Sequence, residues 1–181
     1  STVKNDIRVT GNNPGTGCTT DCEVVNPVAS SVIYRKLANK SGPVSIDELI
    51  TYTIRTTVRQ SPTTSPFVVQ DTLGAGLQLQ TIDNSSNFTC TSSLVCTLPT
   101  GTAPGVYDIV YTARVLSSAV NNVVNTVTGS GANSSCSAPC SLTIPLVASA
   151  VSYGKRGNGP DATAQVGDIL TYTLRVTVSN S

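Results

Sequence analysis

Three polar residues, Lys36, Asp71 and Asn125, stand at positions where alternation along a strand places apolar neighbours on the same face. If these faces point inward, an amine, a carboxyl group and a carboxamide are buried together. Burial favours the neutral forms, so the Lys36 amine could attack the amide carbon of Asn125 while Asp71 carries protons and ammonia leaves. The product would be an isopeptide bond between two strands. The alternative is a Lys36–Asp71 pair, with Asn125 hydrogen-bonding a strand edge.

Period-two patterns predict the strands that would position these groups. The apolar neighbours on the three faces are Val32 and Tyr34 for the lysine, Phe67 and Val69 for the acid, and Val123 and Val127 for the amide. Similar patterns are expected over 50–58 and 107–115, and two short strands over 88–98. Turns rich in Gly, Pro and Asn separate these runs, and no helical period occurs. The fold class predicted is all-β, an immunoglobulin-like antiparallel β-sandwich.

The sequence repeats itself after about 119 residues, which is the length of a small domain. The matching pairs of segments are 168–178 with 48–58, 151–155 with 32–36, 136–140 with 18–22, and 127–129 with 9–11. Residues 1–27 are therefore interpreted as the C-terminal strand and cysteine hairpin of a preceding or partner repeat. Residues 28–145 are expected to form a complete sandwich, and 146–181 the first two strands of the next repeat.

The six cysteines fall in three close pairs: Cys18 and Cys22, Cys90 and Cys96, and Cys136 and Cys140. Paired cysteines also bind zinc, but a zinc site needs a second pair nearby in space. The first and third pairs occupy equivalent places in successive repeats, so they should lie a domain apart. Local disulfides are the favoured interpretation, and they indicate an oxidising, extracellular compartment or a cell surface.

The composition argues against several classes of protein. The 181 residues carry a formal net charge of +1, only 12% of them are charged, and there is no histidine. A chain without histidine lacks the usual general base and the commonest metal ligand, so no enzyme, metal site or cofactor is expected. The sequence has no basic stripe of the kind that binds nucleic acid, so no nucleic-acid partner is expected. No apolar run approaches the roughly 18 residues that a membrane span needs.

Some surface chemistry is suggested by short motifs. The glycosylation acceptor pattern occurs at Asn39, Asn84, Asn87 and Asn133, although chance explains most of these in so Asn-, Ser- and Thr-rich a chain. Tyr52, Tyr107 and Tyr111 could stack on sugars. Alternation places them inward, however, so core packing is the favoured role for these tyrosines.

A family resemblance rests on motifs that cover residues 30–130 in full and both flanks in part. These are Tyr34-x-Lys36, 166–173, 69–77, the cysteine segment 90–98, Pro104-Gly105-x-Tyr107 and 124–127. Together they resemble the repeat of the bacterial and archaeal "domain of unknown function eleven" family. The resemblance implies tandem immunoglobulin-like sandwiches on large secreted or cell-wall proteins and fibres. The trio of Lys36, Asp71 and Asn125 is also similar to one that forms an isopeptide bond in surface-pilin sandwiches.

The sequence therefore predicts an extracellular structural subunit that forms a fibre, filament or surface layer. Its partners would be copies of itself or neighbouring repeats, joined when residues 1–11 or 146–181 pair with another copy by strand addition. The incomplete repeats at both ends of the sequence motivate this expectation, since isolated strand pairs are marginal in water. The alternative is a cell-surface adhesin module that binds glycan or host protein through loops 61–66 and 83–87.

Overall fold

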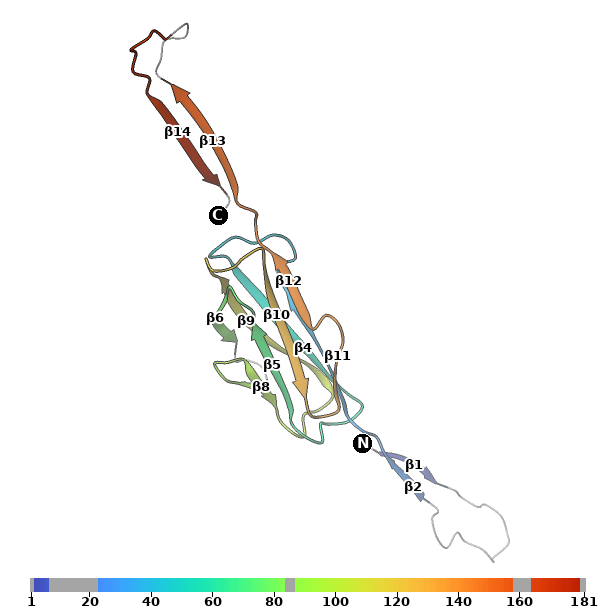
Figure 1. The fold of residues 1–181 in the computed structure, drawn as a ribbon. Helices are drawn as coiled ribbons and strands as arrows, with labels where there is room; N and C mark the ends of the chain where they lie inside the picture. The colour runs from blue at the N-terminus through green and yellow to red at the C-terminus, as the bar shows by residue number, and fades with distance from the viewer. Residues whose placement is uncertain (1, 7–22, 84–86, 158–163, 180–181) are drawn as a thin grey trace, which may run out of the picture.

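The computed structural model describes residues 2–6, 23–83, 87–157 and 164–179 (Figure 1). Alternating patterns give strands throughout this part of the chain, and no helix in it is long and apolar enough to cross a membrane. The strands are β1 (Thr2–Asp6), β2 (Glu23–Pro27), β3 (Ser31–Ala38), β4 (Leu49–Arg59), β5 (Phe67–Leu73), β6 (Leu77–Asp83), β7 (Thr89–Cys90), β8 (Val95–Leu98), β9 (Gly105–Val115), β10 (Asn122–Ser130), β11 (Ser134–Cys136), β12 (Ser141–Pro145), β13 (Ala150–Gly157) and β14 (Tyr172–Ser179).

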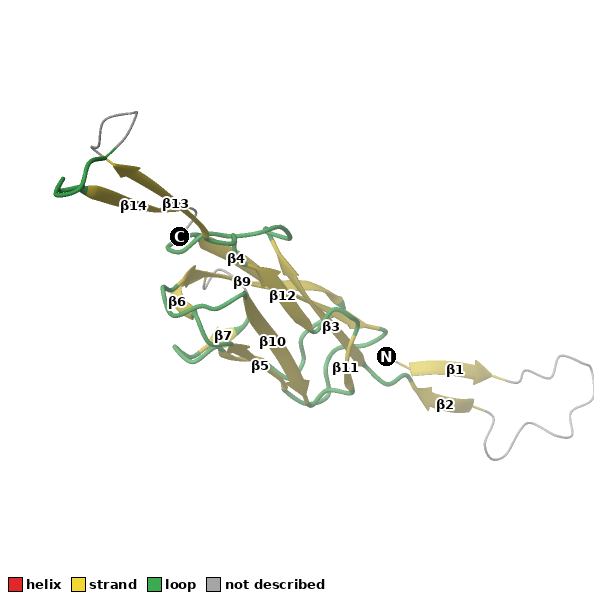
Figure 2. Cartoon of the chain, turned by 45° about the horizontal axis from the view of Figure 1, so that its top comes forward, coloured by secondary structure: helices red, strands yellow, loops and turns green. Residues whose placement is uncertain are grey.

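Strands β3 to β12 form two five-stranded sheets that face each other, so the prediction of an all-β sandwich is confirmed. One sheet has the order β11-β3-β4-β9-β6 and the other the order β12-β10-β5-β8-β7. Figure 2 shows the two layers, with β4 and β9 behind β10 and β5. Every side chain that points between the layers is removed from water, which is the main stabilising term of such a fold.

The core follows the alternation of the strands. In β4, residues Ile50, Tyr52, Ile54, Thr56 and Val58 are buried, and Thr51, Thr53, Arg55 and Thr57 between them face outward. Strand β9 pairs with β4 along ten residues and buries Ile109, Tyr111, Ala113 and Val115 in the same way. The opposite sheet adds Phe67, Val69, Leu98, Val123 and Val127. Strand parity therefore predicted the inward faces of the long strands.

The last segments of the sandwich lie along its first strand. Strand β11 runs parallel to β3, with Ser134 opposite Val32. The Lys36 backbone N–H then donates to the Pro139 carbonyl at 2.9 Å. Beyond the crossover to the other sheet, the Val44 N–H donates to the Pro145 carbonyl, also at 2.9 Å. The edge of β3 is thus covered by backbone hydrogen bonds from the end of the same sandwich.

Two of the three predicted local disulfides are present. Cys90 and Cys96 join β7 to β8, and Cys136 and Cys140 close the loop between β11 and β12. Cys18 and Cys22 lie outside the described residues. The bonds stiffen a short hairpin and the crossover between the sheets, as expected for small loops that contribute little by loop closure.

Two β-ribbons extend from opposite ends of the sandwich (Figure 1). β1 and β2 form the N-terminal ribbon, and β13 and β14 form the C-terminal ribbon. Neither ribbon pairs with a strand of the sandwich in the described part of the chain.

The C-terminal ribbon reproduces the geometry of β3 and β4. Lys155 lies opposite Leu174, as Lys36 lies opposite Ile54. The turns that precede β4 and β14 are also alike. The Ser45 N–H donates to a Glu48 carboxylate oxygen at 2.9 Å, and its counterpart is a bond of 2.7 Å from the Gln165 N–H to the Asp168 carboxylate.

Within these two turns, one position has the same unusual backbone conformation in both copies. Its φ is 65° at Asp47 and 102° at Gly167. Only glycine adopts this region without strain, so the copy with glycine meets the turn's requirement more easily than the copy with aspartate.

The N-terminal ribbon reproduces the pairing of β10 with β12. Thr2 lies opposite Pro27, as Asn122 lies opposite Pro145. Asn5 then lies opposite Val24, as Asn125 lies opposite Leu142. This register aligns Asn5 with Asn125. This alignment differs from the sequence match of 9–11 with 127–129. Residues 9–11 lie outside the described part of the chain.

Candidate functional site

Four strands bring a polar cluster into the middle of the core. Lys36 extends from β3, Asp71 from β5, Tyr111 from β9 and Asn125 from β10. Lys36 and Asn125 have no exposed surface, Tyr111 has 1% and Asp71 has 3%. Lysine and aspartate are almost never buried to this extent unless they are paired. The three residues singled out in the sequence are therefore together in the structure, and Tyr111 joins them.

The contacts within the cluster converge on the amine and on one hydroxyl group. The Lys36 Nζ forms an ion pair with Asp71 Oδ2 and donates a hydrogen bond of 2.7 Å to Tyr111 Oη. Asn125 Nδ2 donates to the same Tyr111 oxygen at 2.7 Å. Lys36 and Asn125 therefore share Tyr111 as a common partner, and this oxygen holds the amine and the carboxamide on one side of the core.

A second tyrosine ring, that of Tyr52, lies beside the amine. Lys36 Nζ lies 4.9 Å from the centre of the Tyr52 ring and 5.3 Å from that of Tyr111. The two rings stack with their centres 5.5 Å apart. The face of the Tyr52 ring attracts a cation and excludes water from it.

Some polar atoms of the cluster are buried without a hydrogen-bond partner among the described residues. They are Asp71 Oδ1, Asn125 Oδ1 and Tyr52 Oη. A buried acceptor that goes unpaired costs about 1–3 kcal/mol. The polar atoms of this site therefore have fewer hydrogen-bond partners than those of an ordinary core, and such unpaired buried groups often mark a functional site.

Burial also shifts the protonation of the pair. It lowers the pKa of Lys36, and the charge and hydrogen bond of Asp71 oppose the shift only in part. It raises the pKa of Asp71 against the opposing charge of Lys36. Both shifts move the ion pair toward a neutral amine beside a neutral acid, and these are the forms that nucleophilic attack on a carboxamide requires.

The residue types allow a balanced reaction. In this reaction the Lys36 amine would attack the Asn125 carboxamide carbon, Asp71 would give a proton to the leaving nitrogen and regain one from the attacking amine, and one ammonia would depart as the amide bond forms. The Lys36 amine is in contact with Asp71 and Tyr111, and the Asn125 carboxamide donates to the same Tyr111 hydroxyl. That hydroxyl would orient the carboxamide while the amine turns toward it.

We expect the intact mass of the folded chain to be lower by one ammonia than the mass calculated with its disulfides. The Lys36→Met variant keeps a similar side-chain volume but has no amine, so its mass should equal the calculated value. A deficit of one water instead of one ammonia would place the bond on Asp71. A wild-type chain without any deficit would contradict the cross-link.

Sequence reasoning assigned Tyr111 to the core but missed its polar role. The signal lay in the strand pairing, because Tyr111 is directly opposite Tyr52 in the register of β4 and β9. Both are inward-facing tyrosines in the sheet that carries Lys36, Tyr52 on the neighbouring strand and Tyr111 on the next one. A hydroxyl group buried next to an amine normally seeks a hydrogen bond.

The tyrosines also predict how stability responds to alkali. Burial raises the pKa of Tyr52 to about 12 and that of Tyr111 higher still. In the unfolded chain both ionise near pH 10, while the folded chain retains their protons, so stability is lost as the pH rises. For Tyr52, a shift of two units corresponds to a loss of about 2–3 kcal/mol between pH 10 and 12.

Denaturant unfolding from pH 8 to 12 measures this loss, and absorbance at 295 nm should show late-ionising tyrosines. The Tyr52→Phe variant should lose less stability over the same range and should be no less stable than wild type at pH 8, since the Tyr52 hydroxyl has no partner among the described residues. An equal loss of stability in both proteins would contradict the assignment to Tyr52.

The predicted glycosylation acceptors have mixed surroundings. Asn87 and Asn133 are exposed, and Asn84 lies outside the described residues. Asn39 is exposed as well, but its side-chain oxygen accepts a hydrogen bond of 2.8 Å from the Thr51 N–H. A glycan on Asn39 would have to preserve this contact beside β4.

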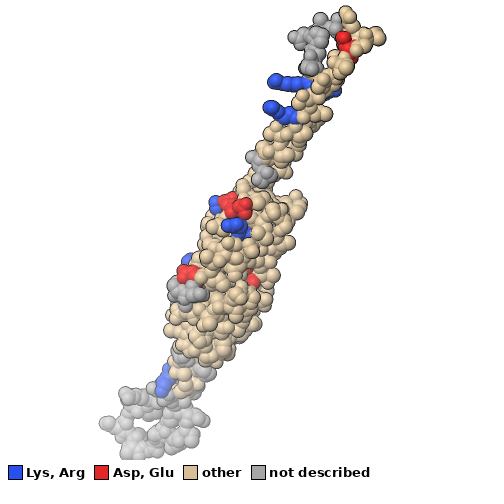
Figure 3. Space-filling model, turned by 90° about the vertical axis from the view of Figure 1, so that its left-hand side faces the viewer, with Lys and Arg blue, Asp and Glu red and all other residues tan. Residues whose placement is uncertain are grey.

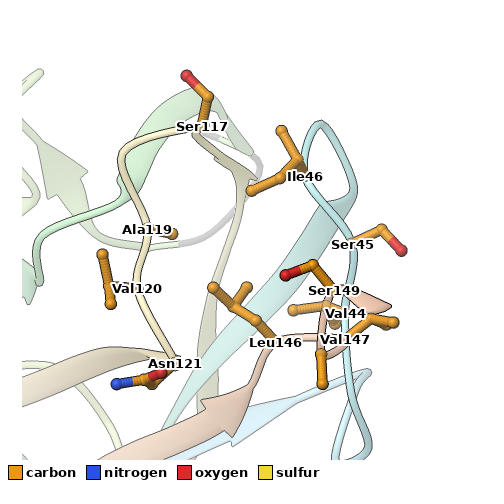
Figure 4. A pocket seen from close by; sticks show the side chains of 11 residues that line it. Val44, Ser45, Ile46, Ser117, Ala119, Val120, Asn121, Leu146, Val147 and Ser149 are labelled. Carbon is orange, nitrogen blue, oxygen red and sulfur yellow. The ribbon is translucent and has the colours of Figure 1, made fainter. Parts of the chain in front are cut away.

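A shallow pocket lies at the end of the sandwich from which β13 departs (Figure 4). Its lining comes from the loop before β4, the loop before β10 and the link to β13, and consists of Val44, Ser45, Ile46, Ser117, Ala119, Val120, Asn121, Leu146, Val147, Ala148 and Ser149. None of these side chains is charged or aromatic, so the pocket offers no stacking platform for a sugar. Among the described residues, no cluster of three or more histidine, cysteine or acidic side chains could hold a metal ion.

Comparisons with known proteins give only distant likenesses. No family model and no curated protein matches the chain. Among solved structures, a non-cellulosomal cohesin from Archaeoglobus fulgidus is similar with a TM-score of 0.40 and 9% identity over 67% of this chain and 93% of that one. The collagen-binding domain of a Staphylococcus aureus adhesin gives 0.38 and 11%, over 66% and 99%. A collagen-binding subdomain of the Enterococcus faecalis surface protein ACE gives 0.34 and 12%, over 84% and 97%.

Proposed function

We propose that this chain is an extracellular structural subunit of a fibre, filament or surface layer. Its unit is an immunoglobulin-like sandwich of the tandem "domain of unknown function eleven" type, and neighbouring repeats or subunits complete one another by adding strands. The observation that carries the proposal is the uncovered apolar face of the β13–β14 ribbon.

This face copies one that is fully buried elsewhere in the chain. Val151, Tyr153, Leu174 and Val178 of the ribbon are 61%, 82%, 70% and 57% exposed. Their counterparts in β3 and β4 are at most 6% exposed, in the same pairing register. Complete burial of such a side chain contributes about 1.5–3 kcal/mol, so a partner that covers the ribbon gains considerable free energy.

Other features are consistent with an extracellular scaffold. The two described disulfides need an oxidising compartment to persist. Figure 3 shows that few charged side chains interrupt the visible face of the sandwich and that basic ones project from the C-terminal ribbon. These ribbon residues are Lys155, Arg156 and Arg175. A scaffold that packs side by side benefits from a sparsely charged surface.

The proposal predicts association through one face of the ribbon. Sedimentation velocity and electron microscopy over a concentration series should show oligomers or filaments of the wild-type chain. Lysine at both Leu174 and Val178 should weaken association at least about tenfold, because two charges would have to be desolvated.

The matched control places lysine at Thr173 and Thr177, which alternate with the tested positions on the same strand. This variant should associate like wild type. A wild-type chain that stays monomeric throughout the series would contradict assembly between subunits. Equal weakening by the two variants would contradict a role for the apolar face.

A further inference from the structure

The C-terminal ribbon carries more than an apolar face. Lys155 occupies the place of Lys36 in the register of β13 with β14, and its Nζ lies 4.0 Å from the centre of the Tyr172 ring. In the sandwich, Lys36 lies over the ring of Tyr52, which is the counterpart of Tyr172. The amine and the aromatic platform of the buried cluster are thus present a second time, but exposed.

The N-terminal ribbon carries the opposite component. Its register places Asn5 where β10 has Asn125, and Asn5 is exposed. The chain therefore contains a buried complete cluster between an exposed carboxamide at one end and an exposed amine at the other. Neither ribbon includes a copy of β5 or β9, the strands that bring Asp71 and Tyr111 to the complete cluster.

We infer that Lys155 is the amine of a second cross-linking site, which is completed by a strand set of the β5–β12 type. The occupant must present an aspartate, an asparagine and a tyrosine hydroxyl on inward faces, as residues 62–145 of this chain do. The N-terminal ribbon of a second copy could pair with the C-terminal ribbon, but it brings the carboxamide alone, without the acid that transfers the proton, so it does not complete the cross-linking site. This inference rests on the proposed strand complementation.

The reaction at the second site is the same as at the first. The Lys155 amine attacks the carboxamide carbon of the occupant's asparagine, the occupant's aspartic acid protonates the leaving nitrogen and takes back the proton lost by the amine, and one ammonia is released as the amide forms. In the uncovered ribbon, the Lys155 amine is exposed to water. Covering the ribbon removes that water and produces the neutral nucleophile, so cross-linking follows docking.

The test extends the full chain with a second copy of residues 62–149 placed directly after Ser181. That position follows β14 as Pro62 follows β4, so the added strands can cover the ribbon. The extended chain should show a mass deficit of two ammonia molecules after the disulfides are counted. Lys155→Met in the extended chain should remove one deficit, and so should Lys36→Met.

Hydrogen exchange of β13 and β14 separates the two ways in which the test can fail. If the ribbon becomes protected but no deficit depends on Lys155, the second cross-linking site is overturned while strand complementation stands. If the ribbon remains unprotected in the extended chain, both are overturned. A protected ribbon with a Lys155-dependent deficit supports both.

Discussion

Replacing Asp71 with alanine is expected to lower the free energy of unfolding by about 3–5 kcal/mol, because it leaves the Lys36 amine buried without its acid. The tyrosine hydroxyl that also contacts the amine is uncharged and cannot replace the carboxylate. The same change removes the proton carrier of the proposed cross-link, so the ammonia deficit should disappear. Denaturant unfolding at pH 7 and intact mass measure the two effects on one sample.

A double variant separates the lost charge pair from lost packing. Lys36→Met combined with Asp71→Leu fills the same space with apolar groups, and such replacements are often neutral or stabilising. It should therefore recover most of the stability lost by Asp71→Ala, but it should not recover the mass deficit. A single variant that loses less than about 1 kcal/mol would contradict a stabilising role for the pair.

Phe67→Ala is expected to cost a similar amount, about 3–5 kcal/mol, through the cavity that it leaves. Phe67 is fully buried between Tyr34 and Phe88, whose ring centres lie 5.5 and 6.3 Å from its own. Gly129 of the neighbouring β10 packs against it so closely that an added Cβ would lie 2.8 Å from the Phe67 ring. Gly129 has no side chain that could fill the space.

The matched control is Val106→Ala in β9, where the side chain is 60% exposed. Surface changes of this kind usually alter stability by at most about 0.5 kcal/mol. Thermal and denaturant unfolding of both variants provide the comparison. If Phe67→Ala lost no more stability than Val106→Ala, the packing described for this corner would be wrong.

Sequence reasoning succeeded where the information is local. The alternation of Ile50, Tyr52 and Ile54 fixes which face of β4 is buried, whichever strands lie beside it. The same parity brought Lys36, Asp71 and Asn125 to inward faces, although they lie on three different strands. A period of two is a property of each strand alone, so no knowledge of the partners is needed.

Features that depend on partners were missed. The parallel pairing of Ser134–Cys136 with β3 could not be predicted, because a strand of three residues is too short to show a period-two pattern. The path of the preceding loop decides where this strand pairs. The role of the Tyr111 hydroxyl depends on which strand pairs with β4. The equivalence of Asn5 with Asn125 appears only in the pairing register of β1 with β2. The segment between β1 and β2 differs in length from the segment between β10 and β12, so the sequence alone does not align the two asparagines.

The backbone bonds between β3 and the end of the sandwich have a mechanical consequence. The chain enters at the start of β3 and leaves at the end of β12 toward the opposite ribbon (Figure 1). Because β11 is parallel to β3, tension along the axis pulls the two strands past each other and loads their hydrogen bonds in shear. Such bonds must rupture together rather than unzip in turn. Single-molecule pulling should therefore give a high rupture force, which Lys36→Met should reduce.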